Sequence, residues 1–222
     1  MQPMKSFRFL AEFVSLKLSF AALMLVAAAQ FGSVAHADSR GEQLYRNCVI
    51  CHGPDGQGIE LQLAPALTGL SEKYMVEQLK KFKNGTRGAH HEDVAGLRML
   101  PMAQTMVTEE DMQAVAKYII SLGSKKVPAT VEGGDAAKGQ ALYATCLACH
   151  GPDGKGIEAT GAPNLTNQHD WYLLTQIKHF KSKIRGYDPS DIGAMQMYPM
   201  MQLLADEQAM KDVVAYIQTL SK

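Results

Sequence analysis

Cysteine is scarce in this sequence of 222 residues, with four in all, too few for a disulfide-stapled scaffold of this length. It also has no excess of charge, because 22 Lys and Arg balance 22 Asp and Glu, which argues against a nucleic-acid binder. After residue 37 no apolar run approaches the roughly 20 residues that span a bilayer, so we expect at most peripheral membrane contact. With 46% hydrophobic and 20% charged residues, the composition is that of a globular protein.

The first 37 residues have the pattern of a secretory signal peptide. Three basic residues accompany an uncharged apolar run over residues 18–29, and Ala35-His36-Ala37 forms a small-x-small cleavage site. An uncleaved membrane anchor is the alternative, but a run of roughly 12 residues is short for spanning. We therefore expect cleavage after Ala37 and export to the periplasm.

The rest of the chain is an internal duplication with one constant offset. Residues 41–122 (the first copy) align without a gap to residues 139–220 (the second copy), 98 positions further on. Between them lies a segment rich in Lys, Pro and Gly, a composition that suits a linker. We predict two tandem domains, 38–124 and 135–222, joined by a linker over 125–134.

Apolar residues in each copy recur at helical spacing. Thr108 is a predicted N-cap before one apolar helical face, and its equivalent in the second copy starts at about Asp206. A middle helix is predicted to begin near Ser71. No run alternates as a strand does, so the prediction is an all-α fold with three or more helices per domain. Units of about 85 residues have thin cores, so something else must fill the middle of each.

The motif Cys-x-x-Cys-His occurs at the same place in both copies and is the attachment signature of c-type haem. Two thiols one helical turn apart can add to the vinyl groups of one porphyrin, and the next residue presents its imidazole to the iron. A thioredoxin-like pair expects a βαβ setting, and a zinc ribbon expects its two cysteine pairs about 15 to 20 residues apart. The sequence therefore predicts two covalent haems, with attachment residues Cys48, Cys51, Cys146 and Cys149 and iron ligands His52 and His150.

A methionine later in each copy is the candidate second iron ligand. Met102 and Met200 each follow a proline and obey the 98-residue offset. Met99 and Met197 obey it too, but proline stiffens the loop expected to present the first pair, which favours Met102 and Met200. Methionine is also a common core filler, so a packing role stays open.

Two protein ligands on each iron leave no free position for peroxide, nitrite or oxygen. The pattern therefore indicates transfer of single electrons and no enzymatic reaction, and a thioether ligand raises the haem potential relative to a second imidazole. His90 and His91 are candidate ligands without a counterpart, since the second copy has Asp188 and Pro189 there. We interpret both histidines as solvent-facing loop residues.

With these motifs the chain resembles the class I cytochromes c, and its duplication resembles the dihaem cytochrome c4 family over essentially all residues after the signal peptide. The resemblance implies two helical haem domains about a pseudo-twofold axis. In class I domains a proline after the motif offers its carbonyl to the proximal imidazole, and Pro65 and Pro163 match that element. Arg87 and Arg185, which obey the offset, are hypothesised partners of haem propionates, with surface arginines as the alternative.

The family resemblance implies a monomeric periplasmic carrier between a quinol-oxidising cytochrome bc complex and a terminal oxidase. The alternative is a dihaem subunit permanently bound to a periplasmic dehydrogenase such as a flavoprotein. A dihaem peroxidase-like enzyme would need an open iron, which the matched methionines disfavour. The basic stretches of the middle helices are either solvated faces or docking sites for an acidic patch on a redox partner; they contain Lys80, Lys81, Lys83, Lys178, Lys181 and Lys183.

Overall fold

The computed structural model describes residues 40–221, so the predicted signal peptide lies outside the described residues. Within that range the structure contains helices and one isolated bridge, between Ile59 and Ala64, but no named strand. The all-α prediction is therefore confirmed for this part of the chain. None of the helices between residues 40 and 221 combines the length and apolarity needed to cross a lipid bilayer.

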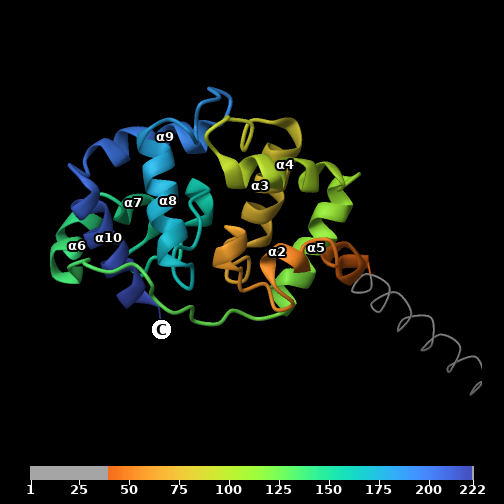
Figure 1. Cartoon of the computed structure of the whole chain (residues 1–222), viewed down its shortest axis with the longest axis horizontal. Helices are drawn as coiled ribbons and strands as arrows, with labels where there is room; N and C mark the ends of the chain where they lie inside the picture. Colours follow the sequence, from red (N-terminus) through yellow and green to blue (C-terminus); the bar gives the residue numbers. More distant parts are fainter. Residues whose placement is uncertain (1–39, 222) are drawn as a thin grey trace, which may run out of the picture. The chain divides into compact units, whose positions relative to one another are not determined.

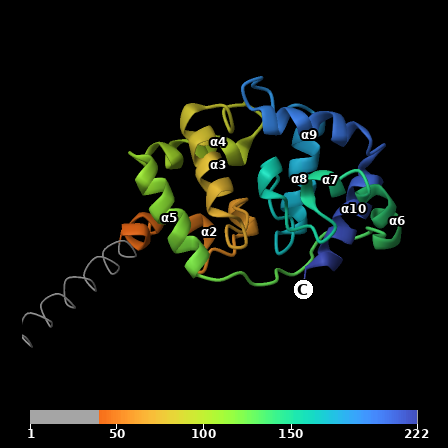
Figure 2. The same cartoon turned by 180° about the vertical axis from the view of Figure 1, so that it is seen from behind.

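Both copies show the same succession of helices (Figures 1 and 2). After a helical segment that ends at residue 45, the first copy contains α2 (Val49–His52), η1 (Glu60–Gln62), α3 (Glu72–Asn84), α4 (Val94–Gln104) and α5 (Glu109–Ser121). The second half contains α6 (Ala136–Tyr143), α7 (Leu147–His150), η2 (Glu158–Thr160), α8 (Asp170–Lys181), α9 (Ile192–Gln202) and α10 (Glu207–Leu220). The segment between α5 and α6 is drawn in both views as an extended green strip.

Side-chain caps set the predicted helix starts. Ser71 Oγ accepts a hydrogen bond from the Tyr74 N–H at 3.2 Å before α3, and Thr108 Oγ1 accepts one from the Asp111 N–H at 3.2 Å before α5. Asp206 caps α10 in the same way. Each cap satisfies an N–H group that the helix itself leaves without a partner. These three predicted starts are confirmed.

Helices α4 and α9 correct one expectation from the sequence. Met102 and Met200 do not lie in loops, because each follows a proline that stands inside a helix. A proline in a helix interior removes a backbone donor and disfavours continuation of the helix, which is why the sequence pattern indicates a loop here. The structure therefore presents both methionines from helices.

Helices α4 and α9 each begin at an aspartate N-cap, and these two caps are 98 residues apart. Asp93 Oδ1 accepts the Gly96 N–H at 2.8 Å, and Asp191 Oδ1 accepts the Ala194 N–H at 3.1 Å. Both aspartates are buried, so the caps are shielded from water. This repeated Asp was the sequence signal from which the helices could have been predicted.

Each copy has its own apolar core, built largely on its last helix. In the first copy Val115 and Ile119 of α5 pack with Met75 of α3, and in the second Val213 and Ile217 of α10 occupy the corresponding places. Burying a side chain of this size stabilises the fold by about 1.5–3 kcal/mol. The two cores are separate clusters, so each copy supports its own Cys motif.

A glycine permits the close crossing of the first and last helices of each copy. A Cβ on Gly41 would collide with the backbone of Ala114, and one on Gly139 would collide with the backbone of Asp212. Both glycines precede the Cys motif by seven residues. This crossing fixes the helix that leads into each motif.

An ion pair and an equivalent histidine–aspartate contact join the copies, and burial lowers the pKa of His179, which favours its neutral imidazole. Lys81 Nζ lies 2.7 Å from Asp191 Oδ1, and by the same offset His179 Nδ1 lies 3.8 Å from Asp93 Oδ1. The aspartates are the helix caps already described. The caps of α4 and α9 are thereby tied to the middle helix of the other copy.

The Lys81–Asp191 pair gives a prediction on stability. We expect Lys81→Ala to lower the free energy of unfolding by roughly 1–3 kcal/mol, because the Asp191 side chain, only 1% exposed, would lose its cation. The control is Lys80→Ala, which removes exposed pairs with Glu77 and Glu109 and should cost less than about 1 kcal/mol. Urea unfolding of both holoproteins measures the difference, and equal losses would contradict the argument.

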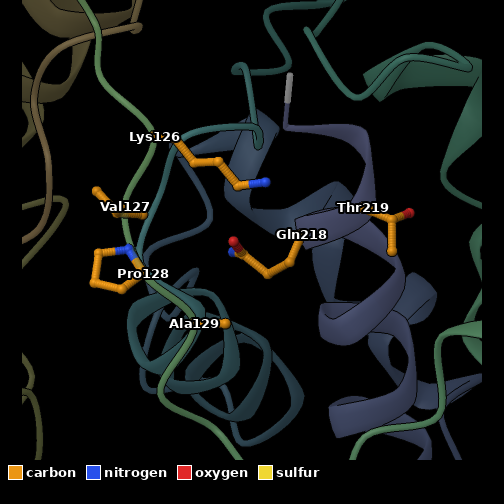
Figure 3. Close-up of a pocket in the computed structure, with 6 residues that line it drawn as sticks. All are labelled: Lys126, Val127, Pro128, Ala129, Gln218 and Thr219. Carbon is orange, nitrogen blue, oxygen red and sulfur yellow. The ribbon is translucent and has the colours of Figure 1, made fainter.

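A surface hollow of about 620 Å³ lies between the linker and α10 (Figure 3). Its lining consists of residues 126–129 with Gln218 and Thr219. These side chains include no cysteine, histidine or methionine, so the hollow is separate from the predicted haem sites. Lys126 Nζ at its rim donates a hydrogen bond to the Ser221 carbonyl at 3.3 Å, which connects the predicted linker to the C-cap residue of α10.

Candidate haem sites

Each Cys motif forms one helical turn that ends at the motif histidine. The His52 N–H donates to the Cys48 carbonyl at 2.8 Å, and the His150 N–H donates to the Cys146 carbonyl at 2.9 Å. No disulfide joins the four cysteines, and the two cysteines of each motif lie within one helical turn of each other. The local backbone therefore holds two thiols and an imidazole together in each copy.

The surroundings of the cysteines distinguish the three interpretations of the motif, which are covalent haem, a thioredoxin-like pair and a zinc site. Burial raises the pKa of the Cys48 thiol to about 11, whereas a thioredoxin-like pair needs a stabilised thiolate. Burial likewise raises the pKa of the Cys146 thiol. A zinc site needs a cluster of ligands, and residues 40–221 contain no group of three or more His, Cys, Asp or Glu side chains suited to a metal ion. The donor set fits covalent haem.

The motif histidines are held by a backbone carbonyl on one ring nitrogen. His52 Nδ1 donates to the Pro65 carbonyl oxygen at 2.9 Å, and His150 Nδ1 donates to the Pro163 carbonyl oxygen at 3.0 Å. A carbonyl only accepts, so each Nδ1 carries the proton and each Nε2 keeps its lone pair. Burial lowers the pKa of both imidazoles, which favours the neutral form that binds a metal.

A buried tyrosine braces each motif. Tyr45 donates its hydroxyl hydrogen to the Gly53 carbonyl at 2.7 Å, and Tyr143 donates to the Gly151 carbonyl at 2.8 Å. Both glycines directly follow the motif histidine. The hydrogen bond therefore connects the helix before each motif to the glycine after it, and the motif histidine lies between the tyrosine and that glycine in the sequence.

The methionine pairs differ in exposure. Met102 is 37% exposed on α4 and Met200 is 38% exposed on α9. Met99 and Met197 are half-buried, and Met197 packs against the core of the second copy. Met197 therefore packs in the core, whereas Met102 and Met200 are exposed residues.

The two arginines lie where the copies meet, so the surface alternative is wrong for both. Arg87 and Arg185 are each 8% exposed. Arg87 Nη2 donates to the Tyr172 hydroxyl at 2.9 Å, and Arg185 Nη2 donates to the Tyr74 hydroxyl at 3.2 Å. Each guanidinium thus reaches a tyrosine of the other copy.

Both guanidinium groups retain an unsatisfied buried donor. The Nε of Arg87 and the Nε of Arg185 have no hydrogen-bond partner, and neither group forms an ion pair with a carboxylate within residues 40–221. Stacking over Phe82 and Phe180 compensates only part of the charge. Burying a cation without an anion is costly, so this pair of donors fits an anionic group such as a haem propionate.

His90 and His91 occupy the turn before α4 and are stacked on each other, with ring centroids 4.6 Å apart. His91 is exposed, as expected from the sequence. His90 is half-buried beside Tyr187 of the second copy, at 5.7 Å between ring centroids, and this contact corrects the solvent-facing interpretation.

The basic stretches of the middle helices have mixed roles. Lys83 Nζ donates to the Val107 carbonyl at 2.9 Å, and its equivalent Lys181 donates to the Met201 carbonyl at 3.2 Å. Lys81 forms the ion pair with Asp191. These three lysines join helices within the protein, so neither a solvated face nor a docking site describes them.

The sequence reasoning missed the residues through which one copy contacts the other. Tyr74 and Tyr172 obey the offset, and that repetition was the available signal. Gln168, which binds the backbone of the first copy, has no such signal because its equivalent is Leu70.

The fold and the two motif sites together define a c-type cytochrome with two haem-binding domains. The family model for cytochrome c matches residues 39–123 and 136–221. Cytochrome c4 of Thiocapsa roseopersicina is 30% identical over 185 residues, which cover 79% of this chain and 88% of that protein. The thiosulfate dehydrogenase electron acceptor of Thiomonas intermedia (strain K12) is 31% identical over 179 residues, or 76% of this chain and 77% of that protein.

A solved structure agrees with the sequence matches. The crystal structure of reduced recombinant cytochrome c4 from Pseudomonas stutzeri has a TM-score of 0.64 at 25% identity, covering 80% of this chain and 95% of that one. The chain belongs to the cytochrome c family and is a dihaem electron-transfer protein of the cytochrome c4 type, not an enzyme. Two c-type haems are bound covalently, and the cysteine pairs of both copies fit the attachment motif.

Proposed function

We propose that the protein is a periplasmic carrier of single electrons in which His52 and Met102 ligate the first haem iron, and His150 and Met200 the second. Haem, when bound, supplies a reversible one-electron iron couple. The observation that carries the proposal is the neutral imidazole of each motif, held at Nδ1 by a proline carbonyl so that Nε2 is available. Met102 on α4 and Met200 on α9, both exposed residues, are the proposed second ligands.

The remaining side chains act by fixing these ligands. The tyrosine braces and proline carbonyls orient the imidazoles, and a fixed ligand sphere keeps reorganisation small when the charge changes. Arg87 and Arg185 are proposed to hold the propionates at the contact between the copies, because their buried Nε donors lack a partner. The proposed mature chain starts at residue 38, with domains 38–124 and 135–222.

The proposed route runs from a quinol-oxidising cytochrome bc complex to a terminal oxidase. Similarity to cytochrome c4 over most of the chain supports a carrier of this type. The second candidate is an electron-accepting subunit or acceptor of a periplasmic dehydrogenase. The relative named as a thiosulfate dehydrogenase electron acceptor favours this candidate.

Purification of the native holoprotein separates the two candidates. A free carrier elutes as a monomer from the periplasmic fraction and is reduced by quinol only when membranes containing the bc complex are added. A specific inhibitor of that complex should abolish the reduction. Stoichiometric co-purification with a dehydrogenase, together with reduction of the cytochrome that the inhibitor does not affect, would overturn the proposed route and support the second candidate.

A further inference from the structure

A glutamine of the second copy binds the first copy next to its proposed iron ligand. Gln168 Oε1 accepts the Ala66 N–H at 2.9 Å, and Gln168 Nε2 donates to the Ala66 carbonyl at 2.9 Å. Ala66 is fully buried and Gln168 is 5% exposed. Water therefore does not compete for the Ala66 N–H, and Gln168 is its hydrogen-bond acceptor.

The Ala66 N–H belongs to the same peptide group as the Pro65 carbonyl. That carbonyl accepts the proton of His52 Nδ1 at 2.9 Å. A continuous chain of hydrogen bonds therefore runs from Gln168 through one peptide unit to the imidazole. Hydrogen bonds in series polarise one another, so donation from the Ala66 N–H makes the Pro65 oxygen a stronger acceptor.

The orientation of the Gln168 amide is fixed by its neighbours. Its Oε1 also accepts the His169 N–H at 3.1 Å, and its backbone carbonyl accepts a hydrogen bond from Gln218 Nε2 at 2.8 Å. Exchanging the amide oxygen and nitrogen would place donors against both N–H groups. The oxygen therefore faces Ala66 N–H.

Two further contacts hold the same segment of the second copy against the loop that contains Pro65. His169 Nε2 donates to the Gln57 carbonyl at 2.7 Å, and Asn164 Nδ2 donates to the Gly69 carbonyl at 3.0 Å. These contacts lie on either side of Ala66 in the sequence. The amide of Gln168 is thus the central contact of three.

The second haem site has no such chain. The equivalent peptide group joins Pro163 to Asn164, and within residues 40–221 the Asn164 N–H makes no hydrogen bond. The residue of the first copy equivalent to Gln168 is Leu70, whose side chain has no polar atom. The contact therefore acts on the first site alone.

We infer that Gln168 is a positioning residue supplied by the second copy to the first haem site, where it lowers the reduction potential of the first haem. The inference rests on the proposed ligation of iron by His52. A stronger acceptor at Nδ1 gives the imidazole more imidazolate character, which stabilises ferric over ferrous iron. The copies are thereby coupled through the protein as well as by their proximity.

The test is Gln168→Leu in the full-length holoprotein, which installs the residue found at the equivalent place in the first copy. The expected results are a higher potential for the first haem, an unchanged potential for the second, and an upfield shift of the His52 Nδ1–H proton in the ferrous state. The matched control is Asn167→Gly. It removes the Asn167 contact with Ser124, suits the positive φ of 59° at this residue, and should change neither potential.

Unchanged reduction potentials in folded Gln168→Leu would overturn the inference. Equal shifts in the potential of the first haem in Gln168→Leu and Asn167→Gly would also overturn it, because they would indicate only that the contact between the copies is loosened. If Gln168→Leu does not mature, amide exchange and proton chemical shifts of the wild-type holoprotein test the inference. There the Ala66 N–H must exchange more slowly than the Asn164 N–H, and the His52 Nδ1–H must resonate downfield of the His150 Nδ1–H; the reverse order contradicts the inference. Absence of haem ring-current shifts on the His52 ring would instead contradict the proposed ligation itself.

Discussion

Met102→Leu is expected to leave both haems attached, to remove the methionine-to-iron charge-transfer band of the first haem and to lower its reduction potential. Leucine matches methionine in size but has no sulfur donor, so ferrous iron loses the thioether that stabilises it. Because axial ligands set haem potentials over a span of about 0.8 V, a fall on the order of 0.1 V or more is expected. The far-red spectrum of the ferric protein measures the band, and potentiometric titration followed in the visible absorption bands of the haems measures the potential.

Two further substitutions control this result. Met200→Leu should produce the same losses at the second haem and leave the first unchanged. Met99→Leu should leave both bands and both potentials as in the wild type, because Met99 has no proposed contact with iron. Loss of the band in Met99→Leu, with the band retained in Met102→Leu, would transfer the ligand assignment to Met99.

The double variant Cys146→Ser, Cys149→Ser should yield a protein with one covalent haem instead of two. Serine cannot form a thioether, so the porphyrin of the second copy has no covalent link. The core of that copy, already small for its length, then loses a large apolar group and unfolds at a lower temperature. Intact mass of the matured product counts the haems, and thermal unfolding measures the stability.

The reciprocal variant Cys48→Ser, Cys51→Ser provides the control for this prediction. It should also retain one haem, now in the second copy, because each copy has its own core and its own motif turn. Two covalent haems in either double variant would contradict attachment through these pairs.

Local sequence signals were sufficient for most of the fold. Ser71, Thr108 and Asp206 act as caps, and capping depends on a few neighbouring residues, so the helix starts could be read directly. Helices α4 and α9 were missed because each contains a proline, whose local preference is against a helix. The buried caps, and for α9 the ion pair between Lys81 and the cap Asp191, outweigh that preference.

The site residues that could be predicted from the sequence are likewise those that lie close together in it. The cysteines, the histidine and the proline carbonyl of each copy lie within 18 residues of one another, so a motif sufficed to bring them together. The contacts between copies join residues far apart in the sequence; Arg185 and Tyr74, for example, are 111 positions apart. Such pairs follow from tertiary packing, and the sequence shows only that both members are repeated.

Equivalent positions that differ between the two copies indicate how the two haem sites differ. Lys81 and His179 are equivalent residues that face equivalent aspartates, yet Lys81 forms an ion pair, whereas burial lowers the pKa of His179 and favours its neutral form. Gln168 and Leu70 are equivalent, yet only Gln168 bonds the other copy. A duplicated chain with these asymmetries is expected to have unequal haem potentials.

Cyanide titration of the fully ferric native holoprotein, followed in the methionine-to-iron charge-transfer band, tests the central claim most directly. If each copy closes its iron with one imidazole and one thioether, the band has the intensity of two methionine-ligated haems and resists stoichiometric cyanide. Ready uptake of one cyanide per protein would show an open iron and contradict a pure electron carrier. A band of half that intensity would show one iron without a thioether and contradict the proposed ligand set.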